Sequence, residues 1–274
     1  MSQYNMPSEE IRDKRLPMAV VADVTLSMLF DSREHNRLKV MNSILEMILE
    51  ECIQDPIIRS VMEVSFILFA DDIVLETPFR NVSQLGPEMV EYAEYIKTEC
   101  VPDSTVTWKK GKKTGCLIPV FDVSWPQNGT NIGKAVSYSV DLLLKRIKKI
   151  EHLSSSYPGY LMLISDGHPL DPDNSGYRDD LAAQEEAIGK LKSHTKATRD
   201  ENDMIVPFII GVGNEAEVNN ARLKLYTEHW KAGHYHFTTE NDEVNWRFIL
   251  ERLKKSIRAS VQLKGFEHIP DSNE

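Results

Sequence analysis

Hydrophobic runs of strand length alternate with stretches of helical periodicity along most of the chain. The apolar runs cover residues 16–22, 61–69, 160–164 and 204–212. Between and after them, apolar residues recur every three or four positions over residues 38–52, 132–150, 181–191 and 243–261. A continuous apolar run is typical of a strand buried on both faces, and strands alternating with helices form a mostly parallel sheet. We therefore predict an α/β fold with a doubly wound, mostly parallel sheet and helices on both faces.

Two segments depart from this alternation. Residues 73–75 form a short apolar run after an Ala-Asp-Asp turn, and Pro78 closes it, which predicts one antiparallel strand at a sheet edge. Residues 100–120 hold two β-prone runs around a lysine-rich turn, which predicts a protruding hairpin inserted in the domain. A surface insertion often carries partner contacts, and Trp108 among the lysines could anchor an interface, although a loop without function is an equal alternative.

The same pattern sets the expected domain organisation. We predict an N-terminal tail over residues 1–15, a single domain over residues 16–262 with the insertion at about 100–120, and a C-terminal tail over residues 263–274. There is no linker long enough to separate a second domain, and there is no internal repeat.

Composition excludes several classes of function. The formal net charge of -10 argues against binding to nucleic acid, because non-specific affinity for phosphates comes from clustered Lys and Arg. No apolar segment is long enough to span a membrane, and residues 1–10 lack the basic start and apolar core of a signal peptide. We therefore expect a cytoplasmic protein with no membrane partner.

The cysteines fit that expectation. Cys52, Cys100 and Cys116 are odd in number and lack metal-ligand spacing, so reduced thiols are expected. Cys52 falls on a helical apolar stripe and is expected in the core, whereas Cys100 and Cys116 flank the insertion and could meet in space.

Oxygen-bearing side chains gather at the ends of the predicted strands. Asp23, Thr25 and Ser27 follow the first apolar run at alternate positions, Asp166 ends the run of residues 160–164, and Thr130 precedes the helix of residues 132–150. The carboxyl ends of parallel strands lie at one sheet edge, so these side chains can converge there. Oxygen donors of this kind suit a small hard cation such as Mg²⁺. The alternative is purely structural: Thr25, Ser27 and Thr130 cap helices, and Asp23 braces its loop.

These segments resemble a known family. Asp23-Val-Thr-Leu-Ser27, Thr130-Asn-Ile-Gly133 and Ser165-Asp-Gly167 resemble the three parts of the metal-ion-dependent adhesion site (MIDAS) of von Willebrand factor type A (vWA) domains. The order and the strand context fit from Pro17 to about Val261. The third motif, in a run like Leu163-Ile-Ser-Asp-Gly-His-Pro169, also resembles the bacterial cytosolic vWA proteins of the tellurium-resistance type.

The resemblance implies a role for each residue. Thr25, Ser27 and Thr130 would contact the cation through their hydroxyl oxygens, while Asp23 and Asp166 would act through bound waters. Mg²⁺ is the expected ion, with Mn²⁺ and Ca²⁺ as alternatives. Withholding direct carboxylate ligands leaves the ion ready to take a carboxylate from a protein partner. The resemblance further implies stress-response or phosphorylation-signalling partners, such as a kinase or a phosphatase.

The first loop departs from the family pattern, which usually reads Asp-x-Ser-x-Ser with a glycine between the serines. Thr25 keeps the hydroxyl of the first serine, but Leu26 replaces the glycine. An apolar side chain at that position could narrow access to the site or form part of a contact surface.

We predict a binding module and not an enzyme. The competing hypothesis is a metal-dependent phosphohydrolase with His168 as base, although a loop histidine is the simpler interpretation of that residue. A scaffold that has lost the ion is a third hypothesis. Gly211-Val-Gly213 is too short for a phosphate-binding loop. His234 and His236 alternate on a predicted edge strand, where a solvated face explains them better than zinc does.

Overall fold

The computed structural model describes residues 15–29, 37–88, 106–121, 129–151, 157–168, 177–195, 205–213, 218–228, 234–239 and 242–262. Apart from Arg15, the two predicted tails lie outside these residues, as do Cys100 and its predicted approach to Cys116.

A seven-stranded sheet forms the centre of the molecule. Its strands are β1 (Leu16–Asp23), β2 (Met62–Phe69), β3 (Ile73–Glu76), β4 (Arg80–Asn81), β7 (Gly159–Ser165), β8 (Ile205–Val212) and β9 (His234–Thr238). The spatial order is β3-β2-β1-β7-β8-β9, with β4 beside β2. The first strand of the chain is therefore central, and the sheet grows outward from it in both directions, as in Rossmann-type folds.

Strand direction agrees with the sequence pattern. β1 pairs in parallel with β2 and β7, and β8 pairs in parallel with β7 and β9. β3 runs antiparallel at the edge, so the predicted doubly wound sheet with an antiparallel edge strand is confirmed. The two-residue strand β4, also antiparallel to β2, was not predicted. The fold is thus a doubly wound, Rossmann-like α/β fold.

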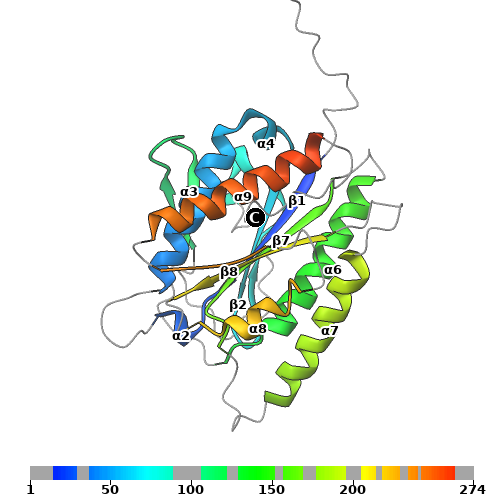
Figure 1. Ribbon diagram of the computed structural model, residues 1–274. Helices are drawn as coiled ribbons and strands as arrows, with labels where there is room; N and C mark the ends of the chain where they lie inside the picture. The colour runs from blue at the N-terminus through cyan, green and yellow to red at the C-terminus, as the bar shows by residue number, and fades with distance from the viewer. Residues whose placement is uncertain are drawn as a thin grey trace, which may run out of the picture.

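Helices cover both faces of this sheet (Figure 1). On one face lie α3 (Arg37–Gln54), α4 (Pro56–Val61) and α9 (Glu243–Gln262), and on the other lie α6 (Ile132–Glu151), α7 (Tyr177–Thr195) and the short α8 (Asn220–Lys224). Two single-turn elements, α2 (Leu26–Leu29) and η1 (Val82–Gln84), complete the described helices. Of these helices, none combines the length and the apolar character that crossing a membrane requires.

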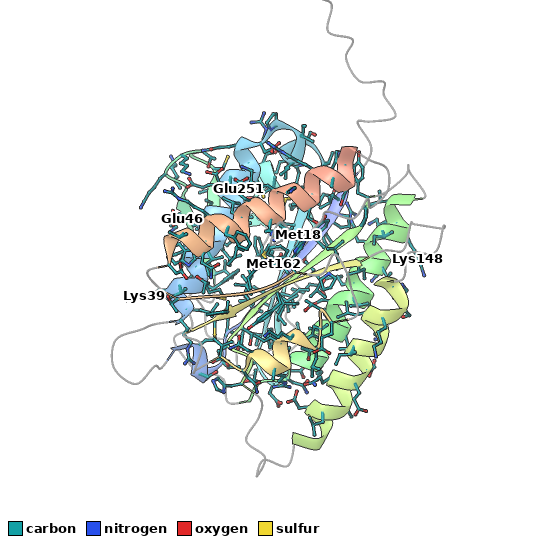
Figure 2. All side chains as sticks on the ribbon, in the orientation of Figure 1. Met18, Lys39, Glu46, Lys148, Met162 and Glu251 are labelled. Atoms are coloured by element: carbon teal, nitrogen blue, oxygen red, sulfur yellow. The ribbon has the colours of Figure 1, made fainter. Side chains whose placement is uncertain are left out.

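The sheet separates two hydrophobic cores. Met18 and Met162 lie on the face beneath α9 (Figure 2), whereas Val21 and Leu163 face α6. Cys52 of α3 is fully buried in the first core, as predicted, and burial raises the pKa of its thiol to about 12. Strands buried on both faces explain why the sequence shows continuous apolar runs and not alternation.

The predicted insertion is a hairpin of β5 (Val106–Lys110) and β6 (Leu117–Phe121), but it does not protrude. Glu50 of α3 is buried and accepts the backbone N–H of Lys113 at 2.6 Å, and Lys109 pairs with Glu46 at 2.5 Å. Trp108 packs partly buried against the first core. The predicted protrusion is wrong because acidic side chains of α3 bind the basic turn and keep the hairpin packed on that helix. This packing buries part of the Trp108 side chain.

Candidate functional site

The loop after β1 turns back on its own aspartate. Asp23 is fully buried, and its Oδ1 accepts the Thr25 backbone N–H at 3.0 Å and the Thr25 hydroxyl at 2.6 Å. The Thr25 and Ser27 hydroxyl oxygens lie 3.1 Å apart. Asp23 braces the loop, as the structural alternative predicted. Among the described residues, the Thr25 hydroxyl bonds to Asp23 and Ser27 and to no helix N–H. The structure therefore gathers two hydroxyls and a carboxylate.

The end of β7 joins this group through a residue that the sequence did not single out. The Ser165 hydroxyl donates to Asp23 Oδ2 at 2.6 Å and accepts the Gly167 backbone N–H at 2.9 Å. Asp166 is fully buried, and its Oδ1 accepts the His168 backbone N–H at 3.0 Å. The only sequence signal for Ser165 was its place beside Asp166 in the third motif.

Gly167 allows this turn for two reasons. Its φ of +76° lies in the left-handed region that favours glycine, and a Cβ there would lie 2.8 Å from Leu223 Cγ. The Asn219 backbone N–H donates to the Asp166 carbonyl at 2.9 Å, which fixes the start of α8 against the same loop.

Two buried carboxyl groups share this edge of the sheet. Burial, and then the charge of Asp166, raise the pKa of Asp23 to about 7, while hydrogen bonds from Ser165 and Thr25 act in the opposite direction. Like charges without full solvation disfavour ionisation, whereas a bound cation restores it. This electrostatic environment favours the binding of positive charge.

One positive charge is already present there. Arg37, the first residue of α3, donates from Nη1 to Asp166 Oδ2 and to the Ser27 carbonyl, both at 2.9 Å. Its side chain is only 8% exposed. Gly213 leaves room for it, since a Cβ there would lie 3.2 Å from Arg37 Nε. Sequence reasoning missed Arg37, although an arginine in the first turn opposes the helix dipole and so signals another role.

Thr130 lies at the same sheet edge, at the start of α6. It is 5% exposed, and its neighbour Asn131 donates its backbone N–H to the carbonyl of Ala70, just after β2, at 2.9 Å. Asn131, not Thr130, caps α6, because its Oδ1 accepts the Lys134 backbone N–H at 2.9 Å. Among the described residues, no hydrogen bond joins the Thr130 side chain to Asp23, Thr25, Ser27 or Asp166.

The donor set fits a small hard cation. Mg–O distances of about 2.0–2.1 Å place adjacent octahedral ligands about 2.9 Å apart. The Thr25 and Ser27 hydroxyl oxygens, at 3.1 Å, are close to that spacing. In the described part of the chain, this site included, no group of three His, Cys, Asp or Glu side chains could hold a metal ion, so a cation here would depend on the two hydroxyl oxygens.

The histidines of β9 do not form the solvated face that was predicted. The rings of His234 and His236 stack 6.0 Å apart, and both lie against Phe208, at 5.3 and 5.4 Å. Phe248 of α9 meets His236 edge to face, and burial lowers the pKa of His236 to about 4. The prediction failed because α9 covers this strand.

Two other expectations concern the rim of the site. Gly211 and Val212 belong to β8, and Gly213 follows them with a φ of +137° and donates its N–H to the Thr238 carbonyl of β9 at 3.0 Å. The side chain of Leu26 lies outside the described residues, although its backbone begins α2.

Comparison with known proteins shows similarity of fold. No protein-family model and no curated protein matches the chain. The PilB minor pilin from Streptococcus sanguinis aligns with 93% of this chain at 12% identity and a TM-score of 0.51. The pilus adhesin SpaC from Lactobacillus rhamnosus GG aligns with 89% at 12% identity and a TM-score of 0.52. The vWF domain of the type V pili tip protein Mfa5 from Porphyromonas gingivalis aligns with 91% at 11% identity, with a TM-score of 0.48.

The alignment covers 97% of the Mfa5 domain but only part of the other two chains. This chain spans 64% of the PilB chain and 30% of the SpaC chain. At 12% identity the two alignments show a shared fold and nothing about shared chemistry.

Proposed function

We propose that this protein is an interaction module that holds a divalent cation at the carboxyl edge of its sheet and binds an acidic group of a partner protein there. The observation that carries the proposal is the pair of hydroxyl oxygens of Thr25 and Ser27, 3.1 Å apart and tied to the buried carboxylate of Asp23. Mg²⁺ is the proposed ion, with Mn²⁺ and Ca²⁺ as alternatives.

The proposed ligand set is Thr25, Ser27, Thr130, Asp23 and Asp166. Thr25 donates its proton to Asp23, so the Ser27 hydroxyl is the donor in their contact, and one lone pair of the Thr25 oxygen stays available to a cation. Ser165 occupies the other oxygen of Asp23 and so fixes the orientation of the carboxylate. The bound cation would supply a positive centre for the partner's carboxylate.

Binding and not catalysis is the favoured role. One protein with a similar fold, SpaC, is described as a pilus adhesin, which supports an interaction function for this architecture. A kinase or phosphatase as partner and a link to tellurite or stress response are predictions that rest on the resemblance of the sequence motifs alone. The cytoplasmic location is a prediction that rests on the composition and the cysteines.

A calorimetric titration with Mg²⁺ and Mn²⁺ tests the proposal. The wild-type protein should bind one ion, and Thr25→Val, which keeps the shape of the side chain but removes the hydroxyl, should lose measurable binding. Thr107→Val on the exposed face of β5 is the matched control and should bind as the wild type does. Absence of heat in both the wild type and the control would reject the metal site.

Turnover separates the binding module from a phosphohydrolase. A phosphohydrolase would hydrolyse a phosphoester such as p-nitrophenyl phosphate in the presence of Mn²⁺ and lose that activity in Asp166→Asn. We expect no hydrolysis by either protein, and metal-stimulated hydrolysis that disappears in Asp166→Asn would favour the enzyme.

A further inference from the structure

Arg37 occupies a position that its own helix does not favour. It is the first residue of α3, where the positive end of the helix dipole repels a guanidinium. Its side chain is nevertheless 8% exposed and directed at the site. Contacts outside the helix must therefore account for its placement.

Those contacts involve the two strand ends that form the site. Arg37 Nη1 bridges Asp166 Oδ2 of the loop after β7 and the carbonyl of Ser27 in the loop after β1, each at 2.9 Å. Arg37 and Asp166 are 129 positions apart in the sequence, and Asp166 is fully buried. The guanidinium thus neutralises one of the two buried carboxylates and lies next to Ser27, whose hydroxyl belongs to the proposed ligand set.

A divalent cation at this edge meets that positive charge. The cation needs Asp166 as a counter-charge, and Arg37 already uses one of its two oxygens. Two like charges a few ångströms apart repel one another, and partial burial reduces the screening that water would provide.

We infer that Arg37 is an internal counter-cation that competes with the divalent cation for Asp166 and so weakens metal binding at this site. This inference rests on the proposed function. The guanidinium holds the two loops together when the metal is absent. A bound ion replaces it as the positive charge that neutralises Asp166. Metal affinity is therefore set by a residue of α3 that is not itself a ligand.

Titration of Arg37 variants with Mn²⁺ tests the inference. Arg37→Gln removes the charge and should bind Mn²⁺ roughly tenfold or more tightly than the wild type, given the strength of a unit-charge interaction at this range. Arg37→Lys keeps the charge and should stay near the wild-type affinity. Arg59→Gln, an exposed arginine on α4, is the control and should leave the affinity unchanged.

Thermal stability gives a second measurement. Without metal, Arg37→Gln should melt below the wild type, because Asp166 is left buried and unpaired. Mn²⁺ should raise its melting temperature by more than it raises that of the wild type, and NaCl at the same ionic strength should not.

The outcomes separate the inference from the proposed function. Equal Mn²⁺ affinities of wild type and Arg37→Gln would overturn the inference and leave the metal site standing. Binding by Arg37→Gln alone would support the inference and reject metal dependence of the wild type. Binding by neither protein would overturn both.

If Arg37→Gln does not fold, the wild type still provides a test. The NMR signal of the Arg37 side-chain Nε–H group, assigned by its absence from Arg37→Lys, should shift on titration with Mg²⁺. A signal that stays in place while the ion binds would contradict the competition.

Discussion

Asp23 is a buried acid whose protonation depends on the fold. Burial and the neighbouring Asp166 raise its pKa from 3.8 to about 7. Between these two pH values the folded protein binds a proton that the unfolded chain releases, so protonation favours the folded state. The contribution of this residue to stability is therefore largest near pH 4, falls as the pH rises to about 7 and changes no further above that.

This dependence can be measured by urea denaturation at several pH values in the absence of divalent ions. From pH 5 to pH 7, the wild type should lose about 1 kcal/mol of unfolding free energy per pH unit relative to Asp23→Asn, which cannot ionise. Above pH 8 the unfolding free energies of the two proteins should change with pH in parallel. Parallel curves over the whole range would mean that Asp23 titrates near its unfolded value.

The distance along the chain between contacting residues decided how much of the site the sequence revealed. Asp23, Thr25 and Ser27 lie within five positions, and their convergence follows from loop spacing alone. The Ser165–Asp23 and Arg37–Asp166 contacts span 142 and 129 positions, and no local pattern specifies them. Those two contacts only become visible once the strand order is known.

At the level of elements, the packing of α6 against α7 depends on Gly133. A Cβ at this position would lie 2.2 Å from the backbone nitrogen of Gln184. The two helices can therefore pack this closely only because Gly133 has no side chain. The sequence motif drew attention to this glycine as part of the Thr130 segment, whereas its visible role is close helix packing.

Alanine substitutions separate this packing role from helix propensity. Gly133→Ala should destabilise the protein by about 1–3 kcal/mol, because the helices must move apart. Gly189→Ala in α7, where nothing lies within 4 Å of the added Cβ, should instead stabilise it by about 0.5–1 kcal/mol. Chemical denaturation measures both, and a gain of stability in Gly133→Ala would show that the helix pair can separate at little cost.

Periodicity predicted most elements but not how they dock. The long helices and the parallel strands carry strong patterns, and each appears in the structure close to its expected range. The seating of the β5–β6 hairpin on α3 depends on Glu46 and Glu50, which the pattern places on the polar side of that helix. In the sequence, an acidic residue on the polar face of a helix gives the same pattern whether it faces water or binds a basic turn.

For the molecule as a whole, the central sheet contributes to both cores. Leu45 of α3 packs in the core beneath α9, and Leu143 of α6 packs in the core on the other face. Because β1, β2, β7 and β8 supply side chains to both, loss of either core exposes the same strands. We therefore propose that residues 16–262 unfold as one unit, as expected of a single domain.

Two matched substitutions test this proposal. Leu45→Ala and Leu143→Ala should each cost about 2–5 kcal/mol and shift one common transition. Far-UV circular dichroism and tryptophan fluorescence should report the same midpoint for each variant. A variant with two separate transitions would show that the faces of the sheet unfold independently.

The buried thiol of Cys52 can report how often α3 opens away from the sheet. The thiolate is the form that attacks an alkylating reagent, and a fully buried thiol with a pKa of about 12 provides almost no thiolate at neutral pH. The reagent reaches that sulfur only when α3 lifts from the sheet, so its labelling rate counts opening events. Arg37 also lies on α3. The labelling rate measured with and without a divalent ion therefore shows whether α3 opens more often when Arg37 loses its contact with Asp166.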